Sequence, residues 1–200
     1  PIVSAPGGIS EQCAEDWWDA VVYTVRESTK NIDRSQIAAL SLSTQGATTA
    51  FVDEGFNSIR PAITWMDIRA MDECRLLDSV LGKEGIYERC GWTTDPGSDA
   101  AKLLWIKKNE PEVFEKTFSF VSTIEFINEK LTGENVVDPT NASIRQFFNI
   151  NTGVWDKDVL DIIGITEDRL PRVMPSGAFI GNLTPSASEA LGLPTTVKVY

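Results

Sequence analysis

Short apolar runs alternate with amphipathic stretches along the 200 residues of this chain, and this alternation is the feature that most limits its fold. Residues 15–30 carry Trp17, Val21 and Val25 on one stripe, which is the spacing of an amphipathic helix. Residues 37–43 form a mostly apolar run that suits a buried strand. Strands that alternate with helices are typical of α/β proteins, so we predict that class, without an interdomain linker.

Capping and turn residues set the expected boundaries. Ser122 and Glu125 make a capping box, Gly133 ends the helix that the box begins, and Asp156 can cap a further helix. A hairpin-type turn is expected at 53–55. The expected strands are 37–43, 47–52, 62–66, 118–121, 136–137, 147–150 and 197–200. The expected helices are 15–30, 68–81, 99–108, 123–132, 156–163 and 186–191.

The balance of charge excludes several classes of partner. The chain has 18 Lys and Arg against 29 Asp and Glu, so its formal net charge is −11. Nucleic acids and anionic membranes need clusters of basic residues, and the longest basic run here is Lys107–Lys108. We therefore expect neither as a partner. No window approaches the roughly 20 apolar residues of a membrane span. The first residues also lack the features of a signal peptide, so a cytoplasmic location is predicted.

Histidine is absent from the chain, which removes Ser-His-Asp and Cys-His catalysis and every histidine metal site within it. The three cysteines, Cys13, Cys74 and Cys90, are widely spaced and form neither a CxxC pair nor a zinc ligand set. We interpret them as buried free thiols in a reducing compartment. No metal-binding residue is predicted.

Common signatures of catalytic sites are also missing. Neither GxxxxGK[ST] nor GxGxxG after a strand occurs, so no phosphate-binding loop is predicted. Residues 95–98 contain Asp-x-Gly, but they lie between expected helices, where a turn is the better interpretation. Pairs among the acidic residues could support glycoside hydrolysis, although spacing alone selects no pair.

The segment 43–49 is a polar interruption between two expected strands. Open α/β sheets bind ligands at such strand ends. Gln45 offers two hydrogen-bond donors and an acceptor, which suits a polyhydroxy ligand, and Gly46 and Ala47 leave room beside it. A simple polar hairpin is the alternative interpretation of the same residues.

A second candidate segment follows the strand expected at 62–66. Trp65 can form a wall against the apolar face of a sugar. Asp67 either accepts a hydrogen bond from a ligand hydroxyl or caps the following helix. Arg69 could pair with Asp67 or with Asp72.

Six segments, in order along nearly the whole chain, resemble the FGGY family of carbohydrate kinases. Asp99 departs from the family pattern, which usually has Pro, Ser or Thr at that position. The segments are 8–18, Trp65-x-Asp67-x-Arg69, the run 97–109 with its Lys102-Leu103-x-Trp105 centre, 132–134 followed by 138–143, 148–150 followed by Trp155, and Leu170–Pro171.

The resemblance implies an actin-like ATPase (ribonuclease H-like) domain, with a mixed sheet and flanking helices, that is incomplete at both ends. It implies transfer of the ATP γ-phosphoryl group to a sugar or polyol, with Mg²⁺ bridging the phosphates. Family members begin with an Asp-x-Gly-Thr loop, which would precede Pro1. Their catalytic aspartate would follow Tyr200, so no catalytic residue is predicted within the chain. The ATP-binding second domain would be absent.

The resemblance also implies a substrate-binding set, namely Gln45, Gly46, Ala47, Trp65, Asp67 and Gly97. Glycerol kinases carry an Arg-Glu pair at Gly46 and Ala47 and a tyrosine at Gly97, so a xylulose-like ketose is favoured over glycerol. Xylulokinases usually have Met-His after the glutamine, which this chain lacks. Lys102 and Trp105 are expected to hold the domain together rather than to touch substrate.

We therefore predict that residues 1–200 are part of the substrate-side domain of a carbohydrate kinase whose whole form uses ATP and Mg²⁺ and could be a homodimer. Alone, the piece is expected to be inactive and to bind neither cofactor. The alternatives are a non-catalytic sugar-binding or regulatory module with a kinase-like fold, and a glycoside hydrolase.

Overall fold

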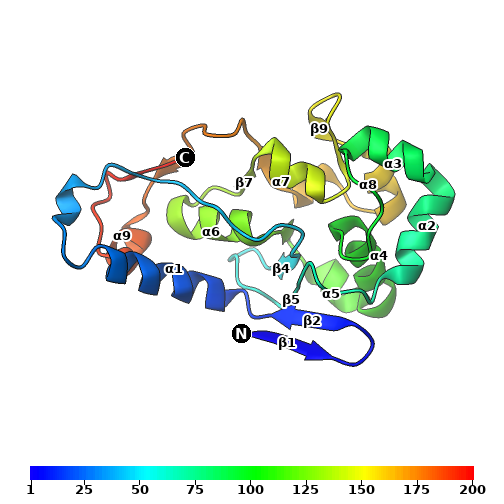
Figure 1. Ribbon diagram of the computed structural model, residues 1–200, viewed down its shortest axis with the longest axis horizontal. Helices are drawn as coiled ribbons and strands as arrows, with labels where there is room; N and C mark the ends of the chain where they lie inside the picture. The colour runs from blue at the N-terminus through cyan, green and yellow to red at the C-terminus, as the bar shows by residue number, and fades with distance from the viewer.

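The structure, a computed structural model, describes all residues from 1 to 200. In Figure 1, α1, α6 and α9 occupy the left half of the molecule, while α2, α3, α4, α5 and α8 occupy the right half. The helices are α1 Glu15–Ser28, α2 Met71–Leu81, α3 Lys83–Cys90, α4 Asp99–Asn109, α5 Pro111–Lys116, α6 Thr123–Thr132, α7 Pro139–Ile144, α8 Lys157–Ile163 and α9 Pro185–Leu191.

The strands are short and pair into several small sheets. In one sheet, β12 pairs in parallel with β3 and antiparallel with β11; in another, β2 lies between β1 and β5. The two-stranded ladders are β4–β6, β7–β10 and β8–β9. The strands are β1 Ile2–Ala5, β2 Ile9–Gln12, β3 Ala39–Leu40, β4 Ala50–Val52, β5 Ala62–Ile63, β6 Ser119–Val121, β7 Val136–Val137, β8 Phe148–Asn149, β9 Val154–Trp155, β10 Arg172–Val173, β11 Gly181–Asn182 and β12 Lys198–Val199. The predicted mixed α/β architecture is confirmed.

Two hydrophobic cores lie on opposite faces of the β4–β6 ladder because side chains alternate along a strand. Phe51 and Phe120 face a larger core, here called the first core, with residues of α2 to α5, α7 and α8. Val52 and Val121 face the other way, into the second core, which also holds residues of α1, α6, α9 and β12. The ladder therefore joins the two halves of the molecule.

Several predicted boundaries are confirmed. The Glu125 carboxylate accepts a hydrogen bond from the Ser122 backbone N–H (2.7 Å), as the capping box requires. Gly133 ends α6 in the left-handed conformation, and Asp156 caps α8. Asp53 Oδ1 accepts from the backbone N–H of Gly55 (2.9 Å), closing the predicted turn.

Other predictions need correction. The strand predicted over 37–43 covers only Ala39–Leu40, and the helix predicted from 68 begins at Met71, because Asp67 and Arg69 form a separate turn before it. The sequence did not predict α3, α5, α7, the β1–β2 hairpin, β9, β10 or β11. Cys74 and Cys90 are buried as predicted, whereas Cys13 is exposed; all three are free thiols.

Candidate functional site

The segment that leads to Gln45 leaves β3 as extended chain and crosses between the two halves of the molecule (Figure 1). The Gln45 amide nitrogen donates to Gln12 Oε1 (3.0 Å), at the end of β2, and lies 3.5 Å from Thr123 Oγ1, at the start of α6. These contacts fix the plane of the amide. They leave its carbonyl oxygen as an acceptor for a ligand hydroxyl.

Gly46 and Ala47 form a tight bend directly after Gln45. A Cβ atom on Gly46 would lie 3.1 Å from Ile144 Cδ1, at the end of α7, so the glycine lets the two segments approach. Ala47 has a φ of +48°, in the left-handed region. Its carbonyl oxygen accepts a hydrogen bond from Lys102 Nζ of α4.

The Trp65 ring is 54% exposed, in a turn that follows β5. Asp67 in the same turn is fully buried, and its carboxylate accepts from the backbone N–H of Ser10 (2.6 Å) and of Arg69 (2.9 Å) and from the Arg69 guanidinium (2.7 Å). Burial alone would raise the pKa of Asp67, but the bonds from Arg69 and Ser10 outweigh it and hold the pKa below its ordinary value. Asp67 thus fixes the turn that presents Trp65.

Gly97 precedes α4 in a turn in which its backbone N–H donates to Asp95 Oδ1 (2.6 Å). A Cβ atom on Gly97 would overlap the backbone carbonyl oxygen of Trp65. The backbones of these two predicted residues therefore lie directly against each other, and only glycine permits this approach without a shift. Ser98 caps α4 through Ala101, so the helix starts at a fixed point beside Trp65.

The beginning of α4 is where most of the predicted site residues meet. Its first residues touch both the bend after Gln45 and the turn that carries Trp65. The contacts are Gly97 against Trp65, Asp99 accepting from Thr49 Oγ1 (2.9 Å) and Lys102 donating to Ala47. Gln45 lies at the other end of its bend, on β2 and α6. The arrangement presents the exposed Trp65 ring and the free side-chain carbonyl oxygen of Gln45 beside small residues, which suits a small polyhydroxy ligand.

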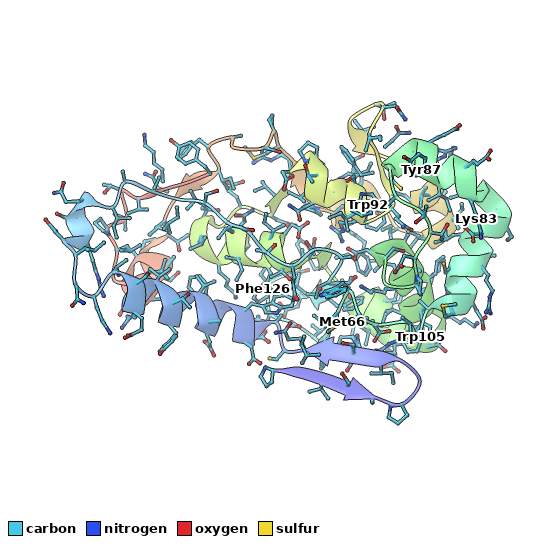
Figure 2. All side chains as sticks on the ribbon, viewed as in Figure 1. Met66, Lys83, Tyr87, Trp92, Trp105 and Phe126 are labelled. Carbon is cyan, nitrogen blue, oxygen red and sulfur yellow. The ribbon has the colours of Figure 1, made fainter.

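Sequence reasoning missed Trp92, which is 47% exposed and lies beside α7 (Figure 2). Its indole N–H donates to Ser143 Oγ (3.2 Å), and Ser143 precedes the Ile144 side chain that touches Gly46. The only sequence signal for it is an aromatic residue directly after a helix-ending glycine, Gly91.

Arg145 was also missed. It is buried between Asp99 (2.7 Å) and Glu125 (3.4 Å), and its guanidinium donates to the Phe120 backbone carbonyl (2.9 Å). Complete burial raises the pKa of Glu125, and Arg145 opposes that rise. The acidic residue at position 99, where the resembled family usually has Pro, Ser or Thr, was the available clue to a buried cationic partner.

A cavity of about 260 Å³ opens near the carboxyl ends of β3 and β12. It is lined by Leu42, Asn128, Asn141 and Tyr200 among others, and by none of the predicted site residues. Asn128 Oδ1 is buried there without a hydrogen-bond partner. The neighbouring residues Ile124 in the cavity wall and Thr123 beside Gln45 make the cavity adjacent to the candidate site.

No group of three or more Cys, Asp or Glu side chains is placed to hold a metal ion. No helix combines the length and the apolar character needed to cross a membrane.

Comparison with known proteins places this geometry in context. Residues 2–200 match the model of the FGGY family of carbohydrate kinases, N-terminal domain. The chain is 28% identical over 202 residues to xylulose kinase of Bacillus subtilis (strain 168), covering 100% of this chain and 40% of that protein. It is 26% identical over 193 residues to gluconokinase of the same organism, covering 96% and 38%.

Solved structures agree with this relationship. Gluconate kinase from Lactobacillus acidophilus superposes with a TM-score of 0.93 at 28% identity, covering all of this chain and 40% of that one. Plasmodium falciparum glycerol kinase, at 22% identity and a TM-score of 0.86, shares the fold, covering 96% of this chain and 40% of its own. The chain thus spans about 40% of the length of the curated relatives it matches.

Proposed function

Because the chain belongs to the FGGY family of carbohydrate kinases, we propose that it forms the substrate side of an enzyme that transfers the γ-phosphoryl group of ATP to a hydroxyl group of a sugar or polyol. The observation that carries the proposal is the meeting of two predicted substrate segments at the start of α4, where Gly97 lies against Trp65 and Lys102 holds Ala47. The kinases of xylulose and gluconate that it resembles match almost the whole chain.

In this proposal each residue has a chemical role. The exposed Trp65 ring covers the apolar face of the sugar, and the Gln45 amide hydrogen-bonds to its hydroxyls. The small size of Gly46 and Ala47 lets the bend pack against Ile144 and Lys102 beside the proposed ligand position. Gly97 lets the Trp65 turn approach α4, and buried Asp67 keeps that turn in place.

The site favours a ketose such as xylulose over glycerol. Gly46, Ala47 and Gly97 stand where the resembled glycerol kinases carry Arg, Glu and Tyr, so the side chains that grip glycerol there are missing from this chain. Gluconate is a second candidate, since two of the similar proteins are named gluconokinase or gluconate kinase.

The roles proposed for this chain end at binding and positioning of the acceptor. Residues 1–200 would form part of the substrate-side domain, while the phosphate-binding groups, the catalytic aspartate and the Mg²⁺ site would belong to the rest of the protein. When bound, Mg²⁺ neutralises charge on the transferred phosphoryl group. The isolated chain would therefore be inactive and would bind neither ATP nor Mg²⁺ by itself.

The test is a steady-state assay of the full-length protein with ATP, Mg²⁺ and, in turn, xylulose, gluconate and glycerol, with ADP formation as the readout. We expect turnover of xylulose or gluconate, and a rise in KM of about tenfold or more in Trp65→Ala, which corresponds to about 1.4 kcal/mol. Tyr23→Ala, an exposed aromatic on α1, is the matched control and should leave KM unchanged.

Absence of turnover with all three acceptors would reject the proposed kinase function. Saturable sugar binding without turnover, measured by calorimetry, would instead support a non-catalytic sugar-binding module.

We also propose a cytoplasmic location and, for the whole protein, a homodimer. Cys74 and Cys90 are buried as free thiols, which fits a reducing compartment. The homodimer rests on the family resemblance alone. Light scattering of the purified full-length protein would measure its mass directly.

A further inference from the structure

The bend at Ala47 needs something to hold it. Ala47 is one of three residues other than glycine with a positive φ, the others being Phe56 and Gln146. In this left-handed conformation the Cβ atom crowds the backbone carbonyl oxygen, so an L-residue avoids it unless its surroundings impose it. The bend also carries Gln45 and Gly46, so its shape decides where the candidate ligand groups point.

Lys102 is the side chain that reaches this bend. It is fully buried on α4, and its ammonium group donates to the Ala47 carbonyl oxygen. Arg145, the other fully buried cation, has carboxylates within ion-pair distance, whereas Lys102 forms no ion pair. A buried ammonium without an ion pair is unfavourable for folding. A neutral apolar side chain would fill the same space with less penalty, so stability does not explain the lysine.

We propose that Lys102 is a positioning residue for substrate binding: its hydrogen bond to the Ala47 carbonyl holds residues 45–48 in the left-handed bend that binds the sugar or polyol. This inference rests on the proposed function. Lys102 is fully buried and cannot touch a ligand, so it acts through Ala47 and not on the reacting atoms.

The charge of Lys102 gives the inference a pH signature. Burial lowers its pKa from 10.5 to about 8, against the opposing attraction of Asp99, Asp67 and Asp95, and Arg69 lowers it further. Above pH 8 the group becomes a neutral amine, which is a weaker hydrogen-bond donor. The bend is then held less firmly, and KM for the acceptor should rise.

The experiment compares two lysines of α4 in the full-length protein. Lys102→Met removes the donor with little change in size, and the variant is expected to fold because it also removes a buried charge. Lys107→Met is the matched control, because Lys107 Nζ likewise donates to a backbone carbonyl, that of Ile163 (2.7 Å) at the end of α8, and not to the bend. We expect KM for xylulose or gluconate to rise about tenfold in Lys102→Met, with kcat changed less than threefold, and to stay within twofold in Lys107→Met.

Two further readouts separate positioning from a general structural role. KM of the unmodified enzyme should rise between pH 7.5 and 9, and this rise should be missing in Lys102→Met. Amide hydrogen exchange in the peptide that contains residues 45–48 should be faster in Lys102→Met and unchanged in Lys107→Met.

An unchanged KM together with unchanged exchange in Lys102→Met would overturn the inference. If the unmodified protein phosphorylates none of the acceptors, the proposed function fails, while the exchange measurement still decides whether Lys102 holds the bend. If Lys102→Met does not fold, the pH dependence of KM in the unmodified enzyme tests the inference instead. A KM that stays constant from pH 7.5 to 9 then overturns it.

Discussion

The two cores of this domain are built from different chemistry. The second core, on the side of α1, α6 and α9, is held by apolar contacts such as the edge-on packing of Trp17 against Phe126 (5.7 Å between ring centroids). The first core carries charges in its interior, and Asp99, Arg145 and Lys102 are all fully buried there or at its edge. Ala47, Trp65 and Gly97 of the candidate site pack against α4, which belongs to this charged side. The difference teaches that apolar burial stabilises both halves, while the first also contains buried charges that fix the geometry of a site at some cost in stability.

On the side of the first core, ion pairs hold the side chains in fixed orientations. Arg145 reaches Asp99, Glu125 and the Phe120 carbonyl at once, and its guanidinium lies over the Phe147 ring (4.9 Å). A planar guanidinium holds such partners in fixed directions. A buried pair adds little net stability compared with apolar packing, but its loss leaves charges without partners. The start of α4 is therefore anchored in position by Asp99.

The largest expected effect is that of Arg145→Met. Asp99 and Glu125 would remain buried without their cation, so the free energy of unfolding should fall by about 3 to 5 kcal/mol in urea titration. Arg172→Met is the control, because Arg172 and Glu134 form an exposed pair (3.1 Å) whose loss should cost below about 1 kcal/mol. A loss of similar size in both variants would show that burial does not distinguish the two pairs.

Leu131→Ala tests the apolar side with the next largest effect. Leu131 is fully buried in the second core, and its truncation should lower the free energy of unfolding by about 3 kcal/mol. Leu131 lies at the opposite end of α6 from Thr123, the residue beside Gln45, so KM for the acceptor should stay within twofold at temperatures where the variant is folded. A KM that rises as it does in Lys102→Met would contradict the division between the two cores.

The sequence predicted the elements whose signals are local and strong. The capping box at Ser122, the cap at Asp156 and the left-handed stop at Gly133 each act within one helical turn, so the residues alone suffice. In contrast, α3 has a weak apolar stripe and α7 has only six residues, although Asp138 caps it and Pro139 starts it. Periodicity cannot reveal helices of that kind.

The candidate site shows a similar limit. The sequence pointed to Trp65 and Gly97 separately, but their contact joins segments about thirty residues apart and depends on the packing of α4. Lys102 was expected to hold the domain together, and only its burial and its bond to Ala47 connect it to the substrate bend. Arg145 carried no local signal, because its partners come from three different elements.

Lys102→Met should raise stability, which sets it apart from the first two variants. The folded pKa of about 8 lies below the ordinary 10.5, so between these values the unfolded chain binds more protons and the stability of the unmodified protein rises with pH. Below pH 8 the buried ammonium is unfavourable, and replacing it should increase the free energy of unfolding by about 2 kcal/mol at pH 7, after the lost hydrogen bond is counted.

This gain should shrink as the pH rises from 8 and should be gone by about pH 10.5, as urea titrations of both proteins at a series of pH values would measure. Stability and substrate affinity then move in opposite directions in the same pH interval. If Lys102 served stability alone, loss of its charge would lower stability and substrate affinity together. A difference in stability between the two proteins that stays constant with pH would rule out a titrating Lys102.

The smallest effects are expected from two glycine substitutions, one in a surface helix and one in the candidate site. Gly85 lies in α3 with open space where a Cβ atom would be, so Gly85→Ala should raise the free energy of unfolding by about 0.5 to 1 kcal/mol through helix propensity. In Gly97→Ala the new methyl group would overlap the Trp65 carbonyl oxygen, and the expected loss is about 1 to 2 kcal/mol. Because the overlap is relieved by moving the Trp65 turn, KM for the acceptor should rise in Gly97→Ala and stay constant in Gly85→Ala. Loss of stability in Gly97→Ala without a change in KM would mean that the turn can shift without altering the ligand surface, and Trp65 would then have to be removed from the proposed site.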